Sequence, residues 1–293
     1  MHLTITGLSK TYPNGVQALR NVDLSISSNM FGLLGPNGAG KSTLMRTIAT
    51  LQSADSGEVL LDGLNVLKEK DSVRRVLGYL PQEFGVYPKM TALDMLDHLA
   101  VMKGILARGE RKDAVEGLLQ RVNLWEWRKK KLGSFSGGMK QRFGIAQALL
   151  GNPKLIIVDE PTAGLDPTER NRFLNLLSSI GSGAIVILST HIVDDVSELC
   201  SEMAIISGGA VILKGPPQPA INEMRNKMWR KSLLRREELD DLQKNLHVTS
   251  THLVGGVTHA RVFSEISPGE GFVPIEPDLE DVYFLTLSRH QLN

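Results

Sequence analysis

One glycine-rich segment has the residue types and the spacing needed to bind a triphosphate. It follows an apolar run at residues 30–34 and precedes a helical pattern from about Ser42 to Ala49. In such a loop, glycines admit phosphate to backbone N–H groups, the lysine adds positive charge, and the serine hydroxyl can reach Mg²⁺. A glycine-rich turn with an incidental lysine is the alternative, but the flanking strand and helix favour a nucleotide site. The segment reads Gly35-Pro36-Asn37-Gly38-Ala39-Gly40-Lys41-Ser42-Thr43.

Two carboxylates end a second apolar run, at residues 155–160. Asp159, at the carboxyl end of a strand, is placed to hold Mg²⁺, mostly through water. Glu160 points to the other side of the pleat or into the following turn, where it could accept a proton from an attacking water. A capping pair for the next helix is the alternative. The phosphate loop upstream favours the catalytic interpretation.

Three further side chains follow strands or precede turns. His191 closes the run at residues 184–190, at the sheet edge where open α/β folds bind ligands, so it could reach a γ-phosphate. Gln82 follows the run at residues 76–80, and its amide could contact Mg²⁺ or orient water. Tyr12 precedes a turn and could stack on adenine, with ordinary packing as an equal alternative.

A second phosphate-binding feature lies at residues 134–142, SFSGGMKQR. Ser136, Gly137 and Gly138 come directly before a helical pattern that runs from Met139 to Leu150. The bare N–H groups of such a helix end can bind an anion. Two phosphate-binding helix ends in one chain therefore need an explanation.

Composition indicates a folded α/β protein. The 293 residues are 42% hydrophobic and 22% charged, and the net charge of +1 gives no general attraction to nucleic acid or anionic membrane. One cysteine, Cys200, excludes a disulfide scaffold and is expected to be a small buried side chain. The N-terminus has no signal-peptide pattern, and the apolar runs have the length of strands rather than membrane spans.

Strands and helices alternate along most of the chain. Residues 3–66 are expected to form short strands, and the later apolar strands with their helices predict a parallel sheet covered on both faces. Thr91 with Asp94 predicts a helix start, as does Asp166 before Pro167. A proline-rich boundary follows residue 215. Beyond it, residues 220–246 have a helical pattern and residues 247–266 look like strands.

Residues 1–216 resemble the nucleotide-binding subunit of an ATP-binding-cassette transporter. The resemblance implies a lysine-loop (RecA-like) α/β ATPase core with an N-terminal antiparallel β region, and a helical subdomain at about residues 84–140. A small α+β unit is expected at residues 217–293. The resemblance rests on the ordered set of Tyr12, GPNGAGKST, Gln82, SFSGGMKQR, LIIVDEPTAGLD with its Asp166, and His191.

The family offers an explanation for the two helix ends. Two cassettes pair head to tail, and Ser136, Gly137 and Gly138 of one would cap the ATP held by Lys41 of the other. The resemblance also makes Glu160 the general base, His191 the γ-phosphate contact and Asp166 a link between the two sites. ATP and Mg²⁺ are the implied cofactors. A second cassette and a transmembrane permease are the implied partners, which would place the chain in the cytoplasm on the inner face of the cell membrane.

Met139 departs from the family pattern, which usually has glutamine there. Methionine is familiar in exporter-type members, and the stretch at residues 277–287 resembles the tails of subunits that serve drug, lipid or polysaccharide exporters. Phe84 and Tyr87 could grip the permease or pack within the subdomain. The alternatives are an importer ATPase, or a cassette acting on ribosomes or DNA. The chain has one cassette and no heptad repeats, and it lacks the guanine-reading Asn-Lys-x-Asp of a GTPase.

Overall fold

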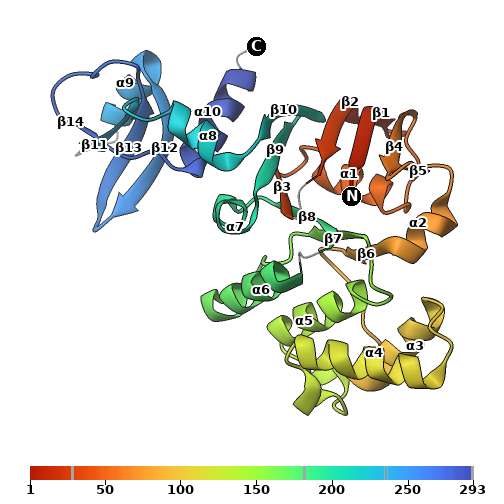
Figure 1. The fold of residues 1–293 in the computed structure, drawn as a ribbon. Helices are drawn as coiled ribbons and strands as arrows, with labels where there is room; N and C mark the ends of the chain where they lie inside the picture. Colours follow the sequence, from red (N-terminus) through yellow and green to blue (C-terminus); the bar gives the residue numbers. More distant parts are fainter. Residues whose placement is uncertain (28–29, 181–182, 234, 236, 292–293) are drawn as a thin grey trace.

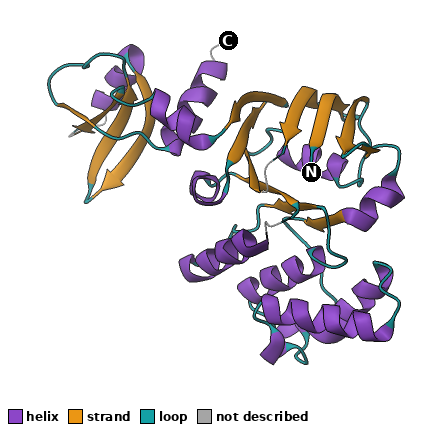
Figure 2. Cartoon of the chain, in the orientation of Figure 1, coloured by secondary structure: helices purple, strands orange, loops and turns teal. Residues whose placement is uncertain are grey.

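The computed structural model describes residues 1–27, 30–180, 183–233, 235 and 237–291. These residues form three sheets with helices packed around them (Figures 1 and 2). The central sheet contains β3 (Met30–Leu34), β6 (Leu77–Leu80), β7 (Leu155–Asp159), β8 (Ile185–Thr190), β9 (Glu202–Ser207) and β10 (Ala210–Gly215). Its order is β10-β9-β3-β8-β7-β6, and only the pairing of β10 with β9 is antiparallel among these strands.

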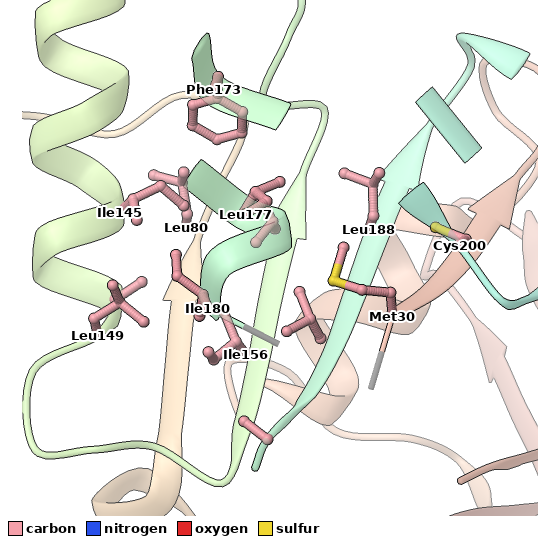
Figure 3. Close-up of a cluster of buried hydrophobic side chains, with 14 of the residues drawn as sticks. Met30, Leu80, Ile145, Leu149, Ile156, Phe173, Leu177, Ile180, Leu188 and Cys200 are labelled. Carbon is pink, nitrogen blue, oxygen red and sulfur yellow. The ribbon is translucent and has the colours of Figure 1, made fainter. Parts of the chain in front are cut away.

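Both faces of the central sheet are buried, which explains why its strands are continuously apolar. Successive side chains of a strand point to opposite faces. Ile157 and Ile187 therefore join a core with the N-terminal sheet, whereas Ile156 and Leu188 join a second core with helices. Figure 3 shows part of this second core, where Phe173 and other side chains pack beside the strands. The predicted parallel sheet is confirmed, with an antiparallel strand added at one edge.

The N-terminal sheet covers the first helix of the core. It has the order β2-β1-β4-β5 and is antiparallel. Its side chains pack with those of α1 against the central sheet. The predicted N-terminal strands are confirmed as β1 (Leu3–Thr11), β2 (Gln17–Ile26), β4 (Ser56–Leu61) and β5 (Leu64–Asn65), and α1 spans Lys41–Ile48.

Helices form a layer on the other side, as the helical insertion predicts (Figure 1). The Thr91 hydroxyl accepts a hydrogen bond from the backbone N–H of Asp94 at 3.1 Å, which confirms the predicted helix start. The helix predicted from Met139 begins two residues earlier, because the Ser136 hydroxyl caps it. The helices of this side are α3 (Ala92–Met102), α4 (Arg108–Arg121), α5 (Gly137–Ala148), α6 (Pro167–Ile180) and α7 (Val193–Leu199).

The C-terminal residues contain a third sheet, which corrects one prediction. The helical pattern expected at residues 220–246 is interrupted, because residues 228–233 pair in register with residues 258–263 as an antiparallel ladder. The sheet has the order β12-β13-β11-β14. Its elements are β11 (Met228–Leu233), β12 (His247–Val254), β13 (Val257–Phe263) and β14 (Phe272–Pro274), with α8 (Pro217–Glu223) and α9 (Glu237–Asn245).

The last helix returns to the core. Helix α10 (Leu279–Gln291) packs on α7 and α8 and on β12, so it joins the third sheet to the cassette core (Figure 1). Asp281, which is fully buried, accepts hydrogen bonds from Arg261 of the sheet, one of them at 2.8 Å from Nε.

Helix α2 (Lys70–Val76) was not predicted, and it shortens the strand expected at residues 76–80 by one residue. None of the described helices is long and apolar enough to span a bilayer.

Candidate functional site

The glycine-rich loop joins β3 to α1 at the carboxyl edge of the central sheet. Gly40 has a φ of 108°, and a Cβ there would lie 2.4 Å from the Ala18 carbonyl oxygen, so only glycine fits without rearrangement. Lys41 is buried, and its Nζ donates to the Gly35 carbonyl at 2.7 Å. Burial lowers the pKa of Lys41, while nearby Glu160 opposes the shift. The backbone N–H groups at the start of α1 and the desolvated Lys41 ammonium therefore lie together at this loop.

Asp159 ends strand β7, which is separated from β3 by β8, and one oxygen of its carboxylate lacks a hydrogen-bond partner within the described part of the chain. Its Oδ1 is buried and accepts no hydrogen bond from the described residues. Burial raises the pKa of this carboxyl, and the nearby Ser189 and Ser42 hydroxyls act in the opposite direction. Leaving such an oxygen unpaired is costly in a folded protein. Its position beside the exposed Ser42 suits a ligand with positive charge.

Glu160 lies between Lys41 and His191. Its Oε1 is 3.5 Å from Lys41 Nζ, and its Oε2 is 2.7 Å from His191 Nδ1. The residue has a φ of 47°, in the left-handed region that costs a non-glycine residue about 1 kcal/mol or more. This backbone turn directs the side chain out of the strand and into the loop. The structure thus brings together three of the predicted site residues that are far apart in sequence.

Tyr12 and Gln82 lie at different places around this centre. The Tyr12 hydroxyl is 3.1 Å from Thr43 Oγ1, which puts the ring beside the first turn of α1. Gln82 is exposed and lines a hollow of about 540 Å³ together with Gly137. No hydrogen bond of the described residues joins Gln82 to Ser42 or Asp159. Its proposed contact with Mg²⁺ stays a prediction.

The second phosphate-binding segment forms a capped helix start. Ser136 Oγ accepts from the Met139 backbone N–H at 3.3 Å, and Ser136 and Gly137 are exposed. A Cβ on Gly138 would lie 2.3 Å from Glu169 Oε2, so this glycine lets α5 approach the first turn of α6. Among the described residues, no hydrogen bond or ion pair joins the segment to residues 35–43.

Asp166 caps α6, as its position before Pro167 predicts. Its Oδ1 accepts from the Glu169 backbone N–H at 2.9 Å, and the side chain is exposed.

Phe84 is half-buried, and its ring packs where a side chain on Gly144 would otherwise lie. Tyr87 is 65% exposed. Of this pair, Tyr87 is the more exposed.

Sequence reasoning missed the polar residues that connect these segments. Thr162, Arg170 and the buried Asp195 form a hydrogen-bonded network close in sequence to Glu160 and His191. Asp195, a buried carboxylate in the helix after His191, does not belong to any of the sequence motifs. The signal was helical spacing in α7: Asp195 lies next to the buried Val196 and four residues before Leu199, which puts it on the inward face of the helix.

Comparison with known proteins adds an independent result. Residues 19–163 match the family model described as ABC transporter. The chain is 39% identical over 217 residues to the uncharacterized ABC transporter ATP-binding protein YxlF of Bacillus subtilis, covering 74% of this chain and 71% of that protein. The chain belongs to the ABC transporter family. It is an ATP-binding subunit of this family and an ATPase.

Further similarities extend this result to another ABC protein and to solved cassettes. The linearmycin resistance ATP-binding protein LnrL of Bacillus subtilis is 41% identical over 186 residues, which are 63% of this chain and 60% of LnrL. A solved dimeric ATP-binding cassette, in a post-hydrolysis state with ADP and Pi, has a TM-score of 0.66 and 28% identity. That match covers 73% of this chain and 98% of the solved one. The ABC cassette fold expected from the motifs is confirmed.

Proposed function

We propose that this ABC cassette powers a membrane exporter by pairing with a second cassette around ATP. The convergence of Lys41, Glu160 and His191 carries the proposal. Ser136 and Gly137 are exposed and make no hydrogen bond to the Lys41 loop within the described chain. This helix start is therefore free to bind the triphosphate held by a second copy. ATP would then hold the two copies together, and hydrolysis would release them.

The donor groups at the end of β7 fit Mg²⁺. Asp159 offers an unpaired carboxylate oxygen, and the Ser42 hydroxyl is close enough to affect the pKa of that carboxyl. Hard oxygen donors of this kind suit Mg²⁺, which keeps several of its waters. Asp159, Ser42 and Gln82 would hold the ion, directly or through water. When bound, it would neutralise charge on the β- and γ-phosphates.

The remaining residues would act on the nucleotide in separate roles. Lys41 binds the β- and γ-phosphates, and Tyr12 stacks on the adenine. Glu160 accepts a proton from water as the water oxygen attacks the γ-phosphorus and the bond to the β–γ bridging oxygen breaks. His191 contacts the γ-phosphate. Asp166, exposed at the start of α6, links the paired sites.

Export rather than import is favoured by two observations. Met139 replaces the usual glutamine after Gly138, and LnrL is named for resistance to an antibiotic. The permease would be a separate chain at the inner face of the cell membrane, and it would contact the helical subdomain at about residues 84–140. Residues 1–216 would be the cassette and residues 217–293 an accessory unit. A cassette acting on ribosomes or nucleic acid has no such support. An importer ATPase is the alternative, because a methionine import ATP-binding protein of Helicobacter hepaticus is 36% identical to the chain over 222 residues.

Glu160→Gln tests the catalytic assignment. We expect the variant to bind ATP, to lose hydrolysis by at least ~10²-fold and to accumulate as an ATP-bound dimer, because only the proton acceptor is lost. ATPase assays and size-exclusion chromatography with MgATP measure both effects. Glu110→Gln, at a carboxylate in the first turn of α4, is the matched control. A fully active Glu160→Gln variant would remove this residue as the base.

Purification from native membranes tests the transport assignment. The full chain is isolated in mild detergent, and the proteins that accompany it are identified. A multi-spanning protein without a cassette of its own is the expected partner. Recovery of soluble partners such as ribosomes, without any membrane protein, would overturn the exporter while leaving the ATPase chemistry intact.

A further inference from the structure

A fully buried carboxylate lies one helical turn beyond His191. Asp195 of α7 has no exposed surface. Its Oδ2 accepts from Thr162 Oγ1 at 2.6 Å and from Thr190 Oγ1 at 3.5 Å. Its Oδ1 accepts from Arg170 Nε at 2.7 Å, and Arg170 Nη2 is 2.6 Å from the same oxygen. Burying a charge is costly unless it is paired in this way, so Asp195 and its three partners form one unit.

The partners of Asp195 come from the segments that carry the proposed catalytic residues. Thr162 lies two residues after Glu160, and Thr190 lies directly before His191. Thr190 Oγ1 also accepts from the Ile192 backbone N–H at 2.9 Å, so it shapes the turn that presents His191. Asp195 thus connects the loop after β7 to the turn after β8. Arg170 adds α6, the helix that Asp166 begins.

We propose that Asp195 is a positioning residue for ATP hydrolysis. It sets the relative positions of Glu160 and His191, whose Oε2 and Nδ1 are 2.7 Å apart, without itself touching the nucleotide. A proton acceptor and a γ-phosphate ligand need this alignment only while the reaction proceeds. Their misplacement lowers turnover rather than binding. The inference rests on the proposed roles of Glu160 and His191.

Asp195→Asn is the first test, because it removes the charge and keeps the shape. We expect kcat for ATP to fall roughly ten- to a hundredfold, with KM changed less than about twofold, since the Lys41 loop makes no bond to this network. Asp194→Asn, at the exposed neighbour in α7, is the matched control and should leave both constants unchanged. Circular dichroism and thermal unfolding give the folded fraction that normalises the rates.

Thr162 gives a second test if Asp195→Asn folds poorly. Thr162→Val removes the hydroxyl donor at constant shape, and Thr162→Ser keeps it. We expect Thr162→Val to reproduce the loss of kcat and Thr162→Ser to restore it. Combining Thr162→Val with Asp195→Asn should cost less than the product of the single effects, because both changes break one unit.

Two results would overturn the inference. One is an unchanged kcat per folded molecule in Asp195→Asn and Thr162→Val, with only the melting temperature lowered. The other is a rise in KM at constant kcat. Glu160→Gln is measured in parallel to separate the two proposals. If it keeps full turnover, the proposed role of Glu160 as the base fails; if it is inactive while Asp195→Asn is normal, only the role of Asp195 fails.

Discussion

His191 Nδ1 lies 2.7 Å from Glu160 Oε2, and this contact joins the loops that follow two neighbouring parallel strands, β7 and β8. The residues are 31 positions apart in the chain. They meet because parallel strands that are adjacent in a sheet end at the same edge. The Lys41 ammonium completes the group at 3.5 Å from Glu160, and it comes from the start of α1, after β3 on the other side of β8.

His191→Ala should slow hydrolysis without preventing nucleotide binding. The side chain is about half exposed, 47%, and contacts Glu160 rather than the Lys41 loop. We expect kcat to fall by roughly 10²-fold, as for other groups that stabilise charge in a transition state. Affinity for ATP, measured by equilibrium dialysis, should change little. His247→Ala, at an exposed histidine of β12, is the control and should behave like the unmodified chain.

Asp159→Asn should stabilise the nucleotide-free protein while removing its response to Mg²⁺. Burial raises the pKa of Asp159 in the folded state, so keeping this carboxyl ionised near neutral pH weakens folding. The protonated carboxyl contributes its full share to the free energy of unfolding at a pH below the ordinary pKa of aspartate. This contribution is lost as the pH rises through the raised pKa of the folded protein. The Asp159→Asn variant does not lose stability in this way, because an amide does not ionise.

Thermal unfolding of both proteins from pH 4 to pH 8 measures the Asp159 effect. We expect the variant to melt higher at pH 8, and the difference to shrink as the pH falls toward 4. The Mg²⁺-dependent increase in ATP affinity should disappear in the same variant. A lower melting temperature at pH 8 would contradict the assignment of Asp159 as a buried carboxylate with an unpaired oxygen.

Cys200 should be inert toward thiol reagents in the folded protein. Burial raises its pKa to about 12, and the nearby Asp195 carboxylate adds to the shift. At pH 8 only about one thiol in ten thousand would be ionised, and the thiolate is the reactive form. Reaction with Ellman's reagent should be slow in buffer and fast in urea. Rapid labelling of the native protein would show that the segment around α7 opens readily.

Asp281→Asn should destabilise the C-terminal unit. The carboxylate is fully buried against Arg261 and also accepts from Thr249 Oγ1 at 3.2 Å. Among the described residues, the substitution leaves the partly buried Arg261 guanidinium ion-paired only with the exposed carboxylate of Asp278, 3.0 Å away, and should cost about 3 kcal/mol of unfolding free energy. Asp241→Asn is the control, because the exposed pair of Asp241 with Lys244 should contribute less than about 1 kcal/mol.

Urea unfolding of both variants measures this difference. Residual ATPase activity at each urea concentration reports on the cassette, and tryptophan fluorescence includes Trp229 of β11. If Asp281→Asn unfolds like Asp241→Asn, the contact between α10 and the third sheet is not a major source of stability.

Features that depend on neighbouring residues could be predicted from the sequence. The Lys41 loop, the capped helix starts at Thr91 and Asp166, and the apolar strand before Asp159 all rest on groups within a few positions of one another. Short-range hydrogen bonds and the repeat of side-chain direction determine such elements. Their order along the chain was enough to identify the family and its ATPase chemistry.

Other features were decided only by the tertiary structure. Residues 228–233 have a pattern compatible with a helix, yet the ladder with β13 makes them a strand, because pairing partners can override local preference. The network around Asp195 unites Thr162, Arg170 and Thr190, which become neighbours only when parallel strands and their helices pack. Sequence specified which groups could do the chemistry. Packing across the sheet decided which of them meet, because contacts between distant segments follow from topology rather than from spacing.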